Sequence, residues 1–258
     1  MRAEPFKYFI HFRLIVTGDA EKEHLPKLFR AISAVSPCNL TVIRKISQRS
    51  PRGPRRQLKM IGRGKKLPDL DATEISIPVF NALKSDPSTV IVLVDDIEHA
   101  RRGQIKGIFE RYRSALDLKL QPEERSRAGV HFLANMLEAY FFAHAGALND
   151  VLNLDLEDWP DDVEDIRHPK RKLKALSDGY REIEHGGKIL DQLDLKYVLS
   201  RPGTCSWLRS CVAWICRHLE DGIDPSVMPD LSGFKSACHL EVGEQAPMTR
   251  WQQSLPDA

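Results

Sequence analysis

The stretch TVIVLVDDIE at residues 89–98 decides the fold of this chain, because it joins an apolar strand to a group of carboxylates. Its consecutive apolar residues, most of them β-branched, are typical of a strand buried on both faces of a parallel sheet. An unpaired carboxylate is costly to bury, so we expect the strand to leave the sheet at Asp95. Asp95, Asp96 and Glu98 would then lie at the carboxyl end of the strand, where open α/β sheets bind ligands, and their oxygens suit a hard cation such as Mg²⁺. The alternative is that Asp96 or Glu98 caps the helix that follows.

A strand–turn–helix unit near the N-terminus supplies a further acid. Residues 6–16 alternate like a strand, and residues 20–35 carry apolar side chains at helical spacing. Glu21 falls at the junction between them, so we expect its carboxylate at the same sheet edge as Asp95 and Asp96. The alternative is that Glu21 only stabilises the first turn of its helix, where acids are favoured.

A lone carboxylate interrupts the most apolar segment of the chain. Residues 130–134 predict a short strand, and residues 135–144 predict a buried helix that contains Glu138. A buried carboxylate needs a cation, a metal or hydrogen-bond donors. We expect Glu138 to join Glu21, Asp95 and Asp96 around one metal ion, and the alternative is an ion pair with an arginine.

Residues 44–66 form a basic segment without a single acid, and they contain two prolines and three glycines. This composition predicts an irregular loop that attracts phosphates, although charge runs are also common on solvated surfaces. The candidate nucleic-acid-binding residues are Arg49, Arg52, Arg55, Arg56, Lys59, Arg63, Lys65 and Lys66.

The composition of the 258-residue chain bounds its class. The net charge of +2 is near neutral, and 42% hydrophobic residues support a substantial core. Five cysteines without a CxxC pair, together with an N-terminus that lacks a secretory pattern, predict a reducing cytoplasmic location. No apolar run approaches the roughly 20 residues of a membrane helix. We expect an α/β domain over residues 1–148, a helical extension over residues 149–221 and a poorly ordered tail over residues 222–258.

Five pieces of the sequence resemble a TOPRIM-like family known as domain of unknown function 4276. They are VTGDAEKEHLPKLF (16–29), VIVLVDDIE (90–98), NMLEAYFFA (135–143), DIRHPKRKL (165–173) and YREIEHG (180–186). The resemblance implies a mostly parallel TOPRIM-like sheet flanked by helices, and acids that hold Mg²⁺ or Mn²⁺ for phosphodiester chemistry. It also implies, for proteins of this kind, a role beside a partner ATPase in bacterial defence against phage. Candidate accessory residues are Glu98, His168, Lys170 and His185.

Two departures from the family pattern bear on activity. Thr17 stands where the family has a glutamate, and Ile97 stands where the family has the second aspartate of its Asp-x-Asp pair. The leading hypothesis is a Mg²⁺-dependent, nuclease-like phosphodiesterase acting on DNA or RNA, with Glu21 and Glu138 as catalytic candidates. The alternatives are a non-catalytic, degenerate TOPRIM subunit that binds nucleic acid or an ATPase, and a small-molecule phosphohydrolase.

Overall fold

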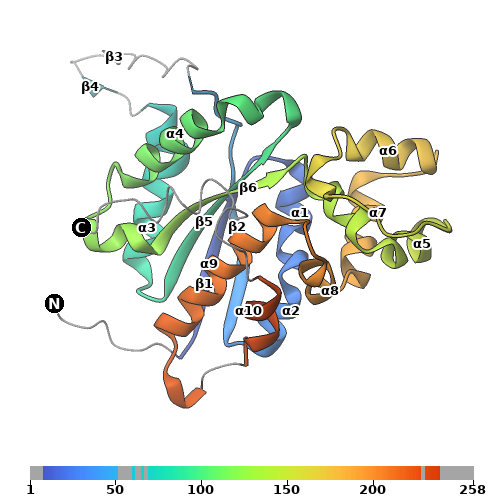
Figure 1. Cartoon of the computed structure of the whole chain (residues 1–258). Helices are drawn as coiled ribbons and strands as arrows, with labels where there is room; N and C mark the ends of the chain where they lie inside the picture. The colour runs from blue at the N-terminus through green and yellow to red at the C-terminus, as the bar shows by residue number, and fades with distance from the viewer. Residues whose placement is uncertain (1–7, 52–59, 62–64, 67–68, 228–229, 239–258) are drawn as a thin grey trace.

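The core of the protein is a four-stranded parallel sheet with helices on both faces (Figure 1). The computed structural model describes residues 8–51, 60–61, 65–66, 69–227 and 230–238. The strands lie in the order β2–β1–β5–β6, with bounds Cys38–Lys45, Ile10–Val16, Thr89–Ile97 and Ala128–Ala134. The expected α/β class with a helical C-terminal region is confirmed. The TOPRIM-like relationship stays a prediction.

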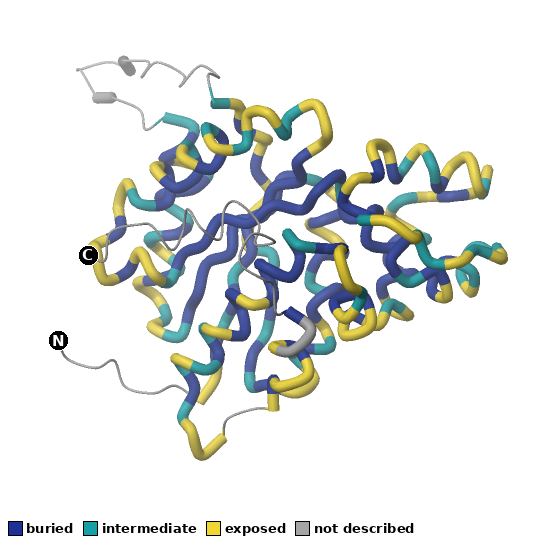
Figure 2. The backbone as a smooth tube through the Cα atoms, in the orientation of Figure 1, coloured by how far each residue is buried: buried dark blue, intermediate teal, exposed yellow. Residues whose placement is uncertain are grey.

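Alternation along the strands divides the apolar core into two layers. On β5, Val90, Val92 and Val94 belong to one cluster of buried residues, whereas Ile91 and Leu93 belong to the other. Successive side chains of a strand point to opposite faces, so each face of the sheet packs against its own helices. Every residue of β5 and β6 is buried, and Figure 2 shows this as a dark central band.

One face of the sheet is covered by α3 (Ile77–Ser85) and α4 (Ile105–Asp117). The remaining helices share the core cluster of Phe12 and Val92 on the other face. Their bounds are Asp19–Leu28 for α1, Arg30–Val35 for α2, Ala145–Leu152 for α5, Pro169–Leu176 for α6, Glu182–Gln192 for α7, Leu195–Ser200 for α8, Ser206–Gly222 for α9 and Ser232–Ala237 for α10. Three of them, α1, α2 and α9, pack directly against strands. Helices α5, α6 and α7 gather at one side of the molecule (Figure 1).

Short irregular helices connect these elements. A π-helical turn, Ala72–Ser76, precedes α3, and 3₁₀ helices cover His99–Gln104, Pro122–Arg127, Leu137–Ala143, Val163–Asp165 and Pro225–Val227. Two further strands, β3 (Met60–Ile61) and β4 (Lys65–Lys66), pair antiparallel within the basic segment. Among the described helices, none is both long enough and apolar enough to cross a bilayer.

The helices of the C-terminal region share their core with the sheet. Cys211, Ile215 and Leu219 of α9 lie in the same buried cluster as Phe12 of β1 and Leu133 of β6. Part of the segment that we expected to be poorly ordered forms α10, which places Phe234 in this cluster. Residues 239–258 lie outside the described part of the chain.

The structure corrects two element boundaries. The strand through Asp95 does not end there but continues to Ile97, with both aspartates inside it. The segment after β6 forms the 3₁₀ helix Leu137–Ala143 rather than a regular α-helix. It follows two residues with positive φ, Asn135 at 56° and Met136 at 80°. Residues other than glycine rarely adopt such backbone conformations, so this turn is a strained connection at the carboxyl edge of the sheet.

Candidate functional site

Asp95 and Asp96 occupy different environments because they point to opposite faces of β5. The carboxylate of Asp95 is fully buried and pairs with Arg101 at 2.9 Å. It also accepts hydrogen bonds from the hydroxyls of Tyr112 at 3.0 Å and Thr17 at 2.8 Å. These partners within the protein compensate its charge, and the metal-ligand role that we expected for Asp95 stays a prediction. Its position indicates a structural role, anchoring α4 and the 3₁₀ helix before it.

Asp96 faces the other side, where its charge acts on Glu21. Its Oδ1 accepts hydrogen bonds from the side-chain amide of Gln48 and, at 3.3 Å, from Thr17. Burial, followed by the charge of Asp95, raises the pKa of Asp96. Thr17 therefore links the two aspartates, because its hydroxyl lies within hydrogen-bond distance of both carboxylates and closer to Asp95.

Glu21 lies in the first turn of α1 and folds back over the turn after β1. A Cβ atom on Gly18 would lie 1.7 Å from Glu21 Oε2, so only glycine leaves room for this carboxylate. The side chain is 3% exposed. Burial, followed by the charge of Asp96, raises the pKa of Glu21 to about 8, and the charge of Glu138 adds to this effect.

Glu138 is a buried carboxylate whose charge is compensated only in part, by the backbone and by Lys170. It lies in the first turn of the 3₁₀ helix after β6, and neither carboxylate oxygen has a hydrogen-bond partner among the described residues. Within the described part of the chain, no arginine pairs with it as the alternative interpretation requires. Burial, followed by the charge of Glu182, raises the pKa of Glu138 to about 7, and Asp96 contributes in the same direction. Glu21, Asp96 and Glu138 thus act on one another electrostatically, each from the end of a different strand.

Three residues of the helical region complete this cluster. Lys170 at the start of α6 pairs with Glu182 at the start of α7, and its charge acts on Glu138 and Glu21. Burial lowers the pKa of Lys170, but the hydrogen bond and charge of Glu182 outweigh it and raise the pKa overall. Burial, followed by the charges of Glu138 and Glu182, raises the pKa of Tyr180. The expected accessory role of Lys170 therefore has a physical basis, since it is the cation beside the acids.

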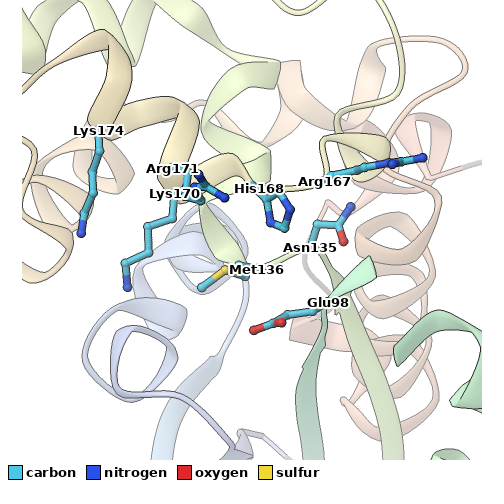
Figure 3. Close-up of a pocket in the computed structure, with 8 residues that line it drawn as sticks. All are labelled: Glu98, Asn135, Met136, Arg167, His168, Lys170, Arg171 and Lys174. Carbon is cyan, nitrogen blue, oxygen red and sulfur yellow. The ribbon is translucent and has the colours of Figure 1, made fainter. Parts of the chain in front are cut away.

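A basic pocket opens next to the carboxylates. It has a volume of about 270 Å³ and is lined by residues from the end of β5, the turn after β6 and the start of α6 (Figure 3). Four of its lining residues, Arg167, Lys170, Arg171 and Lys174, are basic, and His168 lies among them. Glu98 is its only acid. Sequence reasoning selected Glu98, His168 and Lys170 but missed Arg167, Arg171 and Asn135, whose proximity depends on the fold.

The other expected site residues lie away from this pocket or outside the described residues. Arg49 is 3% exposed and pairs with Asp71 and Glu74, both at 2.7 Å, so it stabilises the base of the basic segment rather than reaching a nucleic acid. His185 accepts a hydrogen bond from the backbone of Arg181 and is not among the pocket residues. Arg52, Arg55, Arg56, Lys59 and Arg63 lie outside the described residues, while Lys65 and Lys66 form β4.

The chemistry of the donor set fits a hard cation, although the side chains do not form a finished coordination sphere. Carboxylate oxygens are the ligands that Mg²⁺ prefers, and both oxygens of Glu138 lack a partner within the described chain. Among the described side chains, however, no group of three or more His, Cys, Asp or Glu residues is placed to hold a metal ion as it stands. Binding of a cation by Glu21, Asp96 and Glu138 therefore requires side-chain rotation.

Comparisons with known proteins found no similar protein. No family model, no curated protein and no solved structure matches this chain.

Proposed function

We propose that the protein is a Mg²⁺-dependent phosphodiesterase that acts on nucleic acid, with Glu21, Asp96 and Glu138 as its cation-binding carboxylates. The observation that carries the proposal is that these three acids are buried within electrostatic reach of one another, with both oxygens of Glu138 unpartnered among the described residues. Without a bound cation, such an arrangement disfavours the ionised state of the three carboxylates. A free-energy cost of this kind that the protein does not compensate is typical of functional sites.

Each residue has a distinct part in this proposal. A bound cation would supply the Lewis acidity and positive charge that phosphodiester cleavage requires. Glu21 and Glu138 would hold it from the two sides of the site, and Asp96 from the sheet edge. Lys170 would orient a phosphate oxygen toward the carboxylates, because its charge already acts on two of them. Asp95 would keep Thr17 and Arg101 in place and so fix the position of Asp96.

The test is cleavage of labelled single- and double-stranded DNA and RNA by the full chain, with Mg²⁺ or Mn²⁺ and with EDTA. The wild type should cleave at least one substrate with metal and none with EDTA. Glu138→Gln and Glu21→Gln should lose activity by about a hundredfold or more, the range expected when a catalytic electrostatic contact is removed. Glu184→Gln is a matched control, because Glu184 is an exposed glutamate of α7 that pairs with Lys188. Unchanged cleavage by Glu138→Gln, or none by the wild type, contradicts the proposal.

One observation favours a second function, that of a non-catalytic subunit that binds nucleic acid or a partner ATPase. Asp95, one half of the family's acidic pair, is neutralised by Arg101 within the protein. A protein of this type would bind nucleic acid equally in EDTA and in Mg²⁺ and would not cleave it. Electrophoretic mobility shifts in both conditions separate the two functions.

A further inference from the structure

We propose that the basic pocket at the start of α6 is a binding site for one nucleotide unit, a phosphate together with its sugar and base. The proposal rests on the proposed function for its place beside the reacting phosphate, but binding is measurable without cleavage. The pocket has a cationic side contributed by α6 and the residues before it, and an acceptor side contributed by the ends of β5 and β6 (Figure 3).

The basic residues are placed where a helix does not favour them. Lys170 and Arg171 stand in the first turn of α6, which contains no acid, and His168 is the residue that precedes this helix. The N-terminus of a helix carries partial positive charge, so cations there are unfavourable by a few tenths of a kcal/mol or more each. Arg167, Arg171 and Lys174 have no ion-pair or hydrogen-bond partner among the described residues. All three side chains are exposed, so they are available to pair with an anion in the pocket, which would also offset the unfavourable charge at the helix N-terminus.

A second observation shows that a simple anion does not satisfy the pocket. The side chain of Asn135 is 1% exposed, and its amide Nδ2 donates to the backbone oxygen of Glu164 at 2.8 Å. This contact fixes the amide orientation and leaves Oδ1, an acceptor, without a partner within the described chain. A buried acceptor needs a donor, which a sugar hydroxyl or a base amino group provides and a fully ionised phosphate does not.

The strained turn after β6 holds this acceptor in place. Asn135 and Met136 both have positive φ, and backbone strain of this kind is characteristic of ligand-binding positions. Glu98 presents a second acceptor beside Asn135, and the thioether of Met136 offers an apolar surface for a sugar or base (Figure 3). The pocket therefore combines cations, acceptors and an apolar contact, which together match a nucleotide.

The size of the pocket limits the ligand to one such unit. Its volume of about 270 Å³ lies at or below the lower end of small-molecule sites, which begin near 300 Å³. Lys170 belongs to both the pocket and the carboxylate cluster, and Glu98 is two residues from Asp96. A nucleotide bound here would thus lie next to Glu138 and Glu21. It could come from the end of a strand or from a free mononucleotide.

Titration calorimetry of the full chain in EDTA tests the proposal, with AMP, adenosine and inorganic phosphate as probes. AMP should bind about tenfold or more tightly than adenosine or phosphate, because only AMP engages both sides of the pocket. Arg171→Gln should weaken AMP binding about fivefold to tenfold, the effect of losing one charge-assisted contact. Lys172→Gln is the matched control, since Lys172 lies on the same helix but contacts Trp159 instead. Equal binding of AMP and phosphate, or no effect of Arg171→Gln, overturns the proposal.

Two further arms identify the source and separate this inference from the proposed function. An oligonucleotide with a terminal phosphate that binds more tightly than AMP assigns the strand end, and equal binding assigns the free mononucleotide. Glu138→Gln should retain AMP binding while it loses cleavage. If the wild type binds AMP but cleaves no nucleic acid, the nucleotide site is supported and the phosphodiesterase activity is contradicted. If it cleaves nucleic acid but does not bind AMP in EDTA, the activity is supported and the nucleotide site is contradicted.

Discussion

Asp95 and Asp96 are neighbours in sequence, yet they serve opposite faces of the sheet. Asp95 pairs with Arg101 at 2.9 Å beside α4, whereas the charge of Asp96 acts on Glu21 at the other face. The two-residue period of the strand imposes this division. It separates a carboxylate that stabilises the fold from one that is available to a ligand.

This division predicts different costs for two equivalent substitutions. Asp95→Asn breaks an ion pair whose carboxylate is fully buried and leaves the part-buried Arg101 without its counter-charge, so it should lower the free energy of unfolding by about 2–4 kcal/mol. Asp96→Asn removes a carboxylate that is itself unfavourably buried and should cost less than about 1 kcal/mol. Urea denaturation measures both. Equal losses would show that the two aspartates are structurally equivalent, and the double variant Asp95→Asn, Arg101→Met should recover part of the first loss.

Glu138 makes stability depend on pH in a direction that can be worked out. Its pKa rises from about 4.5 in the unfolded chain to about 7 in the folded protein. The folded state therefore binds more protons between these values, and stability is lost as pH rises through this window. In EDTA, Glu138→Gln should raise the melting temperature at pH 8 by a few degrees and leave it unchanged below pH 4.5. Thermal denaturation at both pH values checks this, and a variant less stable at pH 8 would show that the charge is compensated.

His131 makes the stability of the protein depend on pH at acidic values. It is fully buried beside Trp214, and burial, helped by the charges of His218 and Arg217, lowers its pKa to about 3. The unfolded chain binds a proton near pH 6.5 that the folded protein excludes, so stability falls as pH drops from 6.5 toward 3. The slope from this residue is about 1.4 kcal/mol per pH unit. His131→Leu should reduce the slope by this amount whatever its own cost, and an unchanged slope would assign the titration to other groups.

Two glycines predict opposite outcomes for alanine. At Gly18, which has φ of −108°, a Cβ meets only the end of the Glu21 side chain. Gly18→Ala should change stability by less than about 1 kcal/mol but displace Glu21 and impair the site. At Gly129, a Cβ meets the Trp214 ring at 2.8 Å inside the core, and Gly129→Ala should cost about 1–3 kcal/mol. Denaturation and cleavage assays on both variants separate the effects, and a Gly18→Ala protein with full activity would place Glu21 outside the site.

Much of the fold was predictable because periodicity reports burial directly. The strands at Ile10–Val16 and Ala128–Ala134 and the apolar part of β5 all follow from it. The predicted end of β5 at Asp95 was wrong. Arg101, Tyr112 and Thr17 compensate the charge of Asp95 inside the sheet, and none of them is recognisable as its partner from the sequence.

The site was predictable in part for the same reason. Glu21, Asp96 and Glu138 were identified because each acid follows or ends an apolar strand. The contributions of Arg171 and Asn135 to the pocket were not, since an unpartnered amide oxygen or an unpaired guanidinium exists only once the neighbouring elements are in place.

Calorimetric titration of the metal-free protein with Mg²⁺ at pH 8 tests most directly whether Glu21, Asp96 and Glu138 form one cation site. The wild type and Glu184→Gln should bind with the same affinity, and Glu21→Gln, Asp96→Asn and Glu138→Gln should each weaken binding by about tenfold or more. No binding by the wild type, or equal affinity across the three variants and the control, would contradict it.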